Sequence, residues 1–273
     1  MTIQTTCVPT AEGVPFWTPA QIPPAGTARA QQSASVPTVF QPLTIRSVTL
    51  NNRFVVSPMC MYSSPPSGHM TDFHLVHLGQ FALNGAGLVF AEAIAVQPRG
   101  RISPSDAGIW DDSHVGPLKR IVDFIHSQGQ KAGVQLAHAG RKASTFPPWI
   151  QIQHNQREQQ QTEPAQEAKK DAHAQHKGNK CIAGKDVHGW PDDVVAPSAI
   201  KYEEGYPEPR AMSVDEIKDL LEDYKKAARR AVEAGFDVFE IHAAHGYLLT
   251  EFLSPLSNVS FLFPSPKKEK KNP

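Results

Sequence analysis

The chain is poor in cysteine and has no excess of charge of either sign. Its three cysteines, Cys7, Cys60 and Cys181, are too few and too scattered for a disulfide framework or a zinc knuckle. Lysine plus arginine equals aspartate plus glutamate at 27 each, so the charge does not favour nucleic acid or an anionic membrane as a partner. The sequence also lacks an apolar run of about 20 residues and a basic, apolar leader. We therefore expect neither a membrane span nor a secretory signal, and we predict a cytoplasmic protein.

Composition divides the chain into distinct stretches. Residues 1–38 are rich in Pro, Ala, Thr and Gln without periodicity, which is typical of an extended arm. Residues 39–258 carry a periodic pattern that is interrupted at 147–186 by a segment rich in Gln, His and Lys. We expect this segment to be a disordered loop, because it has too few apolar residues to offset its ordering entropy. A less favoured hypothesis is that its irregularly spaced histidines, His154, His173 and His176, bind a metal ion.

Outside that loop, short apolar runs alternate with helical patterns. The predicted strands cover residues 53–59, 87–96, 131–140 and 236–244, after a small hairpin that turns near Arg46 and Ser47. The predicted helices cover residues 71–86, 114–129 and 213–235. Such an order predicts parallel strands joined by helical crossovers, in a doubly wound sheet or a barrel. The motif GxGxxG is missing after the first strand, where SPMCMY stands, and this disfavours a Rossmann dinucleotide domain.

The predicted helices have recognisable caps and apolar faces. Ser213 and Glu216 form a capping-box pattern, and Gly235 supplies a stop for the same helix. Its apolar positions are Ile217, Leu220, Leu221, Tyr224, Ala227, Ala228, Ala231 and Val232. The helix at 114–129 has Leu118, Ile121, Val122 and Ile125 on one face, and the helix at 71–86 has Phe73, Val76, His77 and Phe81 at helical spacing.

Side chains suited to chemistry follow each predicted strand, at the edge where α/β barrels gather their active sites. They are Ser57, Pro58, Met59, Cys60 and Tyr62 after the first strand, Glu92 and Ala93 at the second, Gln135, His138 and Arg141 at the third, and His242, His245 and Tyr247 at the fourth. Singly, each has a structural explanation, such as a buried amide bonded to backbone or a cysteine acting as a small hydrophobe. Their shared position favours a functional site.

A metal site is an alternative explanation for part of this set. Glu240 and His242 alternate onto the same strand face, and His138 completes a possible zinc site of a hydrolase. No aspartate follows the fourth strand to complete such a site, and His245 and Tyr247 would have no role in it. We therefore predict no resident metal.

Several motifs in order resemble one known family. They are SPMCMYSS, FAEAIAV with RGRIS, GIWDD, QLAHAGRKAS, GWPDDVVAPSAI and EIHAAHGYLLTEFLSPLSN. From about Phe40 to Asn258 the sequence is similar to the old yellow enzyme family of FMN-dependent ene reductases, most of all to the branch with cysteine in the SPMCMY motif. The resemblance implies a (β/α)8 TIM barrel with FMN at the carboxyl ends of the strands, of which this chain carries about the first four βα units.

The resemblance also implies a role for each matching residue. Ser57, Pro58, Met59 and Cys60 would line the flavin, with Cys60 near its N5 edge; Ala93 would touch the flavin, and the Gln135 amide would bond to its pyrimidine ring. His242 and His245 would donate hydrogen bonds to the substrate carbonyl, Tyr62 would face the substrate, and Tyr247 would deliver a proton. The reductant would be NADPH or NADH, and the substrate an α,β-unsaturated aldehyde or ketone.

The resemblance stops after Asn258, and Thr250 stands where relatives usually have histidine. Residues 259–273, VSFLFPSPKKEKKNP, form a tail unlike the family, and we expect that it derives from an unspliced intron or a frameshift. Four parallel strands do not close a barrel and leave two strand edges unpaired, which favours self-association. The alternative to an active oxidoreductase is a truncated remnant without turnover.

Overall fold

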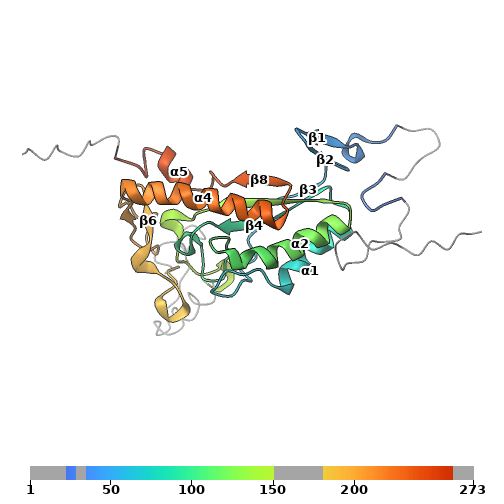
Figure 1. Ribbon diagram of the computed structural model, residues 1–273. Coiled ribbons are helices and arrows are strands. Elements are labelled where there is room, and N and C mark those ends of the chain that lie inside the picture. Colours follow the sequence, from blue (N-terminus) through green and yellow to red (C-terminus); the bar gives the residue numbers. More distant parts are fainter. Residues whose placement is uncertain (1–22, 29–34, 151–180, 261–273) are drawn as a thin grey trace, which may run out of the picture. The chain divides into compact units, whose positions relative to one another are not determined.

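The computed structural model describes residues 23–28, 35–150 and 181–260, which form two compact units (Figure 1). The first unit comprises Met1–Pro98, Ser105–Ala137 and Glu222–Ile241, and the second comprises Arg99–Pro104, His138–Leu221 and His242–Pro273. Most of the predicted arm, the centre of the Gln-rich loop with His154, His173 and His176, and the tail from residue 261 lie outside the described residues. In the ranges that are described, no helix is long and apolar enough to cross a membrane.

A parallel sheet forms the centre of the first unit. Its strands are β3 (Val55–Val56), β4 (Leu88–Ala95), β5 (Lys131–Ala137) and β8 (Val238–Ile241), in the order β3-β4-β5-β8. All three neighbouring pairs are parallel, as the alternation of strand and helix patterns predicts. Most side chains of β4 and β5 are buried, which explains why these strands read as continuous apolar runs.

The strand boundaries differ from the predicted ones at several points. The first strand is much shorter than 53–59, because the chain leaves the sheet before Pro58, which has no N–H to donate to a ladder. The second strand, Leu88–Ala95, agrees with the predicted 87–96, so Glu92 and Ala93 lie inside the strand rather than after it, next to a register shift between Phe90 and Ala93. The fourth strand ends at Ile241, so the histidines that follow it are on a loop.

Helices α1 (Asp72–Leu83) and α2 (Val115–Ser127) pack against each other in the first unit. The predicted apolar face of α2 is confirmed, since Leu118, Ile121, Val122 and Ile125 are all buried. The apolar pattern of α1 is misleading: Phe73 and Val76 are 46% and 72% exposed, and the buried residues are His74, Leu78, Gly79 and Ala82. His74 is buried because its Nδ1 accepts the Thr71 N–H at 3.0 Å, while its Nε2 lies 3.6 Å from Glu92. A polar contact therefore outweighs hydrophobic periodicity in this helix.

Helix α4 (Val214–Ala234) begins with the predicted capping box. The Ser213 N–H donates to Glu216 Oε2 at 2.9 Å, and the Glu216 N–H donates to Ser213 Oγ at 3.2 Å. Gly235, at φ +93°, ends the helix in the left-handed region. Two residues of its predicted core face are instead on the surface, since Leu221 is 57% and Val232 is 65% exposed. The buried positions of the predicted set are Leu220, Ala227 and Ala231.

Asp237 joins the start of β8 to the elements beside it. Its carboxylate accepts hydrogen bonds from His126 Nε2 at 2.7 Å, Lys131 Nζ at 2.9 Å and the Ala132 N–H at 2.9 Å. Burial alone would raise the pKa of Asp237, but these three hydrogen bonds outweigh it and lower the pKa to about 2. The hairpin of β1 (Leu43–Ile45) and β2 (Val48–Leu50) is confirmed, with Arg46 at φ +54° in its turn.

The second unit is built from short elements. Its strands are β6 (Val195–Ala196) and β7 (Arg210–Ala211), and its short helix is α5 (Leu248–Leu253). The described 3-10 helices of the chain are η1 (Thr38–Phe40), η2 (Pro98–Gly100), η3 (Asp112–His114), η4 (Gly140–Lys142), η6 (Lys185–Val187) and η7 (Pro191–Asp193). Ala139, Ala143 and Val194 form a small core against which Tyr247 packs. Cys181 and Ala183, at the described end of the predicted loop, are also buried.

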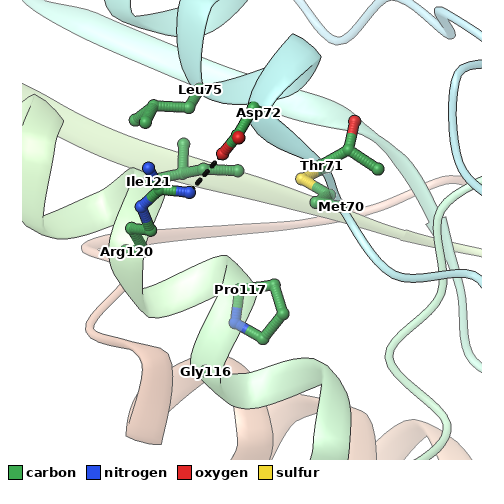
Figure 2. Close-up of a pocket in the computed structure, with 8 residues that line it drawn as sticks. All are labelled: Met70, Thr71, Asp72, Leu75, Gly116, Pro117, Arg120 and Ile121. Carbon is green, nitrogen blue, oxygen red and sulfur yellow. Dashed lines mark hydrogen bonds and ion pairs between the residues drawn. The ribbon is translucent and has the colours of Figure 1, made fainter.

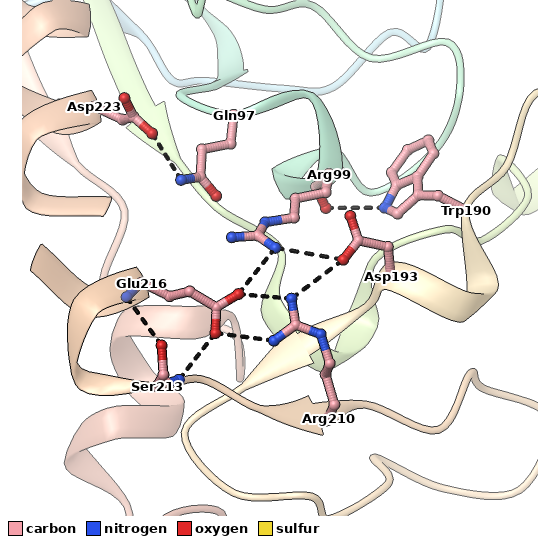
Figure 3. A network of polar contacts seen from close by, with 8 residues as sticks. All are labelled: Gln97, Arg99, Trp190, Asp193, Arg210, Ser213, Glu216 and Asp223. Atoms are coloured by element: carbon pink, nitrogen blue, oxygen red, sulfur yellow. Dashed lines mark hydrogen bonds and ion pairs between the residues drawn. The ribbon is translucent and has the colours of Figure 1, made fainter. Parts of the chain in front are cut away.

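An ion-pair network ties the start of α4 to the elements before it (Figure 3). Arg210 holds Glu216 through two contacts of 2.6 and 2.9 Å, and Arg99 reaches Glu216 and Asp193 at 3.4 Å each. The Arg210 guanidinium and the Ser213 N–H lower the pKa of Glu216 to about 2. The network therefore fixes the residues before and inside the capping box of α4.

Candidate functional site

Three neighbouring strands place a row of side chains next to one another in the first unit. Ala93 of β4 pairs in register with Gln135 of β5, and Gln135 pairs with Glu240 of β8. Gln135 Nε2 donates a hydrogen bond to Glu240 Oε1 at 2.5 Å. The structure thus brings together two of the residues that the sequence predicts for a flavin, Ala93 and Gln135. It adds Glu240, whose role as the partner of the amide follows only from the strand register.

The loop after β3 carries Ser57, Pro58, Met59, Cys60 and Tyr62, and a buried carboxylate holds it. Glu92 is 3% exposed, and its Oε2 accepts the N–H of Met61 at 2.7 Å. Burial raises the pKa of the Cys60 thiol, and the carboxylates of Asp106 and Glu92 add to the effect, so this thiol stays protonated at neutral pH. Met59 is 51% exposed. The loop therefore presents apolar and neutral groups, held in place by Glu92.

In the second unit, the rings of His242, His245 and Tyr247 come together directly after β8. The His242 ring lies 5.2 Å from that of His245 and 5.0 Å from that of Tyr247, measured between centroids, with both pairs edge to face. The rings of His245 and Tyr247 are 6.5 Å apart. Tyr247 is the N-cap residue of α5, whose following residue Leu248 donates its N–H to the His138 carbonyl. The three residues predicted to act on the substrate thus form one cluster in the second unit.

The backbone fixes which nitrogen of His242 carries the proton. The N–H of Ala244 donates to His242 Nδ1 at 3.3 Å, so the neutral ring carries its hydrogen on Nε2 and can donate from there. His245 is exposed and has φ +58°, and Tyr62, also predicted to face the substrate, has φ +51°. Non-glycine residues in this region are strained, and such strain clusters at ligand sites.

Sequence reasoning did not single out two further charged residues of the second unit, Lys142, whose Nζ lies 4.8 Å from the Tyr247 ring centroid, and Glu251. Glu251 on α5 is 1% exposed, and its Oε1 accepts the Arg141 N–H at 3.0 Å. Burial raises the pKa of Glu251 to about 8, although the hydrogen bond from Arg141 opposes this shift. The carboxyl thus links α5 to the loop after β5. Lys142 and Glu251 lie in the segments that follow β5 and β8, which was the available signal, but their contacts depend on residues distant in the sequence.

The zinc alternative finds no support in the geometry. Glu240 is bonded to Gln135, and His138 is buried with its Nδ1 accepting the Gly140 N–H at 3.0 Å. Burial lowers the pKa of His138 to about 3, with a smaller contribution from Arg99, so this ring is neutral. Within residues 23–28, 35–150 and 181–260, no group of three or more His, Cys, Asp or Glu side chains is arranged to hold a metal ion.

A separate pocket of about 270 Å³ lies between the first turns of α1 and α2 (Figure 2). It is lined by Met70, Thr71, Asp72, Leu75, Gly116, Pro117, Arg120 and Ile121. An ion pair between Arg120 and Asp72 spans it. None of the predicted site residues lines this pocket, and its two charged groups neutralise each other.

Comparison with known proteins decides the family. Residues 38–260 match the NADH:flavin oxidoreductase / NADH oxidase family. The chain belongs to this family. A NADH:flavin oxidoreductase of Gibberella zeae is 49% identical over 249 residues, which cover 91% of this chain and 52% of that relative. The NADPH dehydrogenase of Bacillus subtilis is 42% identical over 81% of this chain and 52% of its own length. This NADH:flavin oxidoreductase family chain thus spans about half the length of the curated relatives it matches.

Solved structures agree with this assignment. The Old Yellow Enzyme from Pichia sp. has a TM-score of 0.61 and 27% identity, over 81% of this chain and 50% of that structure. Morphinone reductase has a TM-score of 0.58 and 28% identity, over 81% and 52% respectively. The predicted resemblance to old yellow enzymes is confirmed. The predicted fold class, part of a (β/α)8 barrel, is confirmed too, since the parallel sheet supplies four of the eight strands of such a barrel.

Proposed function

We propose that this chain forms part of an FMN-dependent NAD(P)H oxidoreductase that reduces the activated C=C bond of α,β-unsaturated carbonyl compounds. The observation that carries the proposal is the cluster of the His242, His245 and Tyr247 rings directly after β8. Two ring N–H donors and a phenol are the groups needed to polarise a carbonyl oxygen and to protonate the adjacent carbon. Relatives named NADPH dehydrogenase, and a structure of morphinone reductase with tetrahydroNAD, support a nicotinamide as the reductant.

The residues proposed to hold FMN have chemistry suited to a flavin ring. The exposed Met59 and the protonated thiol of Cys60 offer an apolar, uncharged surface to a flat ring. The Gln135 amide contains both a donor and an acceptor, which the pyrimidine edge of a flavin requires. The Glu240 carboxylate orients that amide by accepting from its Nε2. The other residues proposed to contact the flavin are Ser57, Pro58 and Ala93.

The proposed mechanism assigns one task to each ring. FMN, held by the residues named above, would supply the hydride chemistry of the reaction. His242 and His245 donate N–H groups to the carbonyl oxygen and stabilise the negative charge that develops there, as in an oxyanion hole. Tyr247 donates its hydroxyl proton to the α-carbon, and water returns a proton to the phenolate. Tyr62 faces the bound substrate.

The test is a purified chain incubated with FMN, NADPH and 2-cyclohexenone. We expect a protein-bound flavin band near roughly 450 nm, which the cofactor's own chemistry supplies, together with enone-dependent oxidation of NADPH. In Tyr247→Phe, enone reduction should fall by about 10² or more, as expected for loss of a general acid. Reduction of the bound flavin by NADPH should remain, because that step does not use the phenol.

Two results would contradict the proposal. A colourless protein that does not oxidise NADPH would identify the 273-residue chain as an inactive remnant. A Tyr247→Phe variant with unchanged enone reduction would remove the phenol from the mechanism. Lys218→Met is the matched control, since Lys218 is 68% exposed on α4 and pairs with Asp215; its activity should equal that of the parent chain.

We also propose that the chain self-associates through the two edges of its parallel sheet. In the described residues, β3 pairs only with β4, and β8 pairs only with β5. Val55 on β3 is 46% exposed, and Phe239 and Ile241 on β8 are 39% and 51% exposed. If a second copy is related to the first by a twofold rotation about an axis along the strands, β3 of the second copy runs parallel to β8 of the first and can pair with it. Light scattering coupled to size-exclusion chromatography should give twice the 29.9 kDa of one chain, and a monomer would contradict this.

A further inference from the structure

The ammonium group of Lys142 lies between two tyrosine rings. Its Nζ is 4.8 Å from the ring centroid of Tyr247 and 4.7 Å from that of Tyr202. The same Nζ donates a hydrogen bond to the carbonyl oxygen of His245 at 3.0 Å. A cation within about 6 Å of a ring centroid is attracted to the electrons of that ring. Lys142 thus contacts the turn that carries two of the proposed catalytic rings.

Neighbouring elements determine the electrostatics around this lysine. Lys142 ends η4, and the residue before it, Arg141, donates to the carbonyls of Ile200 and Lys201. The Arg141 guanidinium also lies 5.4 Å from the centroid of the Tyr202 ring, so this ring faces two cations. Burial lowers the pKa of Lys142, the carboxylates of Glu203 and Glu251 oppose that change, and Arg141 adds to it. Placing a partly buried cation here costs desolvation energy. A lysine that served only the fold could lie at an exposed position without this desolvation cost, so its partly buried position favours a functional role.

We propose that Lys142 is a positioning residue for Tyr247. It holds the ring through the cation–ring contact and the His245 carbonyl, and its positive charge stabilises the phenolate that remains when Tyr247 releases its proton. In that step the O–H bond of Tyr247 breaks, a C–H bond forms at the substrate α-carbon, and solvent later returns the proton. The Tyr202 ring provides a second contact with the ammonium, at 4.7 Å. The relevance to catalysis rests on the proposed function, whereas the effect on the phenol does not.

The direct test is a titration of the Tyr247 phenol in the full chain without flavin or substrate. The tyrosinate absorbance of the protein minus that of Tyr247→Phe isolates the signal of this ring. In Lys142→Met we expect the midpoint of that signal to rise by up to about one pH unit. Burial lowers the pKa of Lys142, so the ammonium and the phenol lose their protons over the same range and the lysine charge is only partly present at the midpoint. Lys142→Arg keeps the charge and should restore most of the original midpoint.

Controls separate charge from folding. Far-ultraviolet circular dichroism verifies that each variant is folded, and Lys142→Gln replaces Lys142→Met if the latter is not, since a glutamine amide still donates to the His245 carbonyl. Lys218→Met removes a distant exposed lysine and should leave the midpoint unchanged. A Tyr247 midpoint that is equal in the parent chain and in the folded neutral variant overturns the proposal.

An activity readout adds a second arm where the chain reduces enones. There, Lys142→Met should lower kcat and leave KM for the enone nearly unchanged, and Lys142→Arg should recover kcat. A fall in KM and kcat that arginine does not recover would indicate a packing role and overturn the proposal. If the chain has no activity, the phenol titration still decides the role of Lys142, so failure of the proposed function and failure of this inference remain distinguishable.

Discussion

Asp237 offers the most direct test of what holds β8 in the sheet. Its carboxylate is 14% exposed and accepts from His126, Lys131 and the Ala132 N–H. The pKa of Asp237 falls from 3.8 to about 2 on folding. Because one pH unit corresponds to about 1.4 kcal/mol, the ionised carboxylate contributes about 2 kcal/mol of stability. Asp237→Asn should lose this amount, since the uncharged amide cannot accept from three donors.

The sign of the pH dependence follows from the lowered pKa. A carboxyl group whose folded pKa is depressed contributes its full stability above its unfolded pKa of 3.8, and loses it as the pH falls through about 2. Between pH 5 and pH 3, the difference in unfolding free energy between the parent chain and Asp237→Asn should therefore shrink by about 1 kcal/mol. The two basic residues that face this carboxylate, His126 and Lys131, are present in both proteins, so their own effect on stability cancels in the comparison.

Urea unfolding followed by circular dichroism at pH 5 and pH 3 measures this difference. Asp215→Asn is the matched control, because Asp215 is 87% exposed and contacts Lys218 alone at 2.8 Å; no measurable change is expected there. A difference between the parent chain and Asp237→Asn that is the same at both pH values would refute the electrostatic reasoning. A difference near zero at pH 5 would refute the anchoring role itself.

Two further predictions concern the loops around the site. Gly140 has φ +58°, and a Cβ there would lie 2.3 Å from Glu251 Oε1, so Gly140→Ala should lower the unfolding free energy by more than about 1 kcal/mol in urea. Gly116→Ala, where a Cβ meets nothing within 4 Å, should be neutral or stabilising, and equal effects at both positions would contradict the steric argument. Because burial raises the pKa of its thiol, Cys60 should react with iodoacetamide at pH 8 far more slowly in the native chain than in urea, as followed by peptide mass spectrometry. Rapid native labelling of Cys60 would show that the thiol ionises easily.

Local sequence patterns predict a helix or strand correctly where its apolar spacing and its capping residues indicate the same element. The order of strands and helices, the apolar face of α2 and the capping box of α4 all follow from nearest neighbours along the chain. The apolar residues that are exposed on α1 and α4 could not be predicted in this way, because periodicity shows that a helix has an apolar side without showing what covers it. In α1 the buried side includes His74, whose Nε2 lies 3.6 Å from Glu92 on β4, and that proximity depends on the fold.

The same limit applies to the candidate site. Strand ends indicate where Gln135 and His242 lie, because the chain there passes from a buried run to polar residues. The partner of Gln135 depends on the register between β5 and β8, 105 residues apart, and no local signal encodes it. The contact of Lys142 with Tyr202 joins residues on opposite sides of the predicted loop. Motifs therefore predict which residues are candidates for the site, whereas the contacts that support those side chains are visible only in the structure.

The same short hydrogen-bonded turn follows both β5 and β8, but the histidine in it has different surroundings in the two places. In each case a histidine directly follows the strand, and its Nδ1 accepts the backbone N–H two residues later, from Gly140 to His138 and from Ala244 to His242. Wherever such a ring is neutral, the backbone thereby places its proton on Nε2. His138 is buried, and its ring lies against Gly100. The His242 ring instead lies 5.2 Å from that of His245 and 5.0 Å from that of Tyr247, so the same short motif gives an enclosed histidine after one strand and, after the next, the histidine that we propose as a hydrogen-bond donor to substrate.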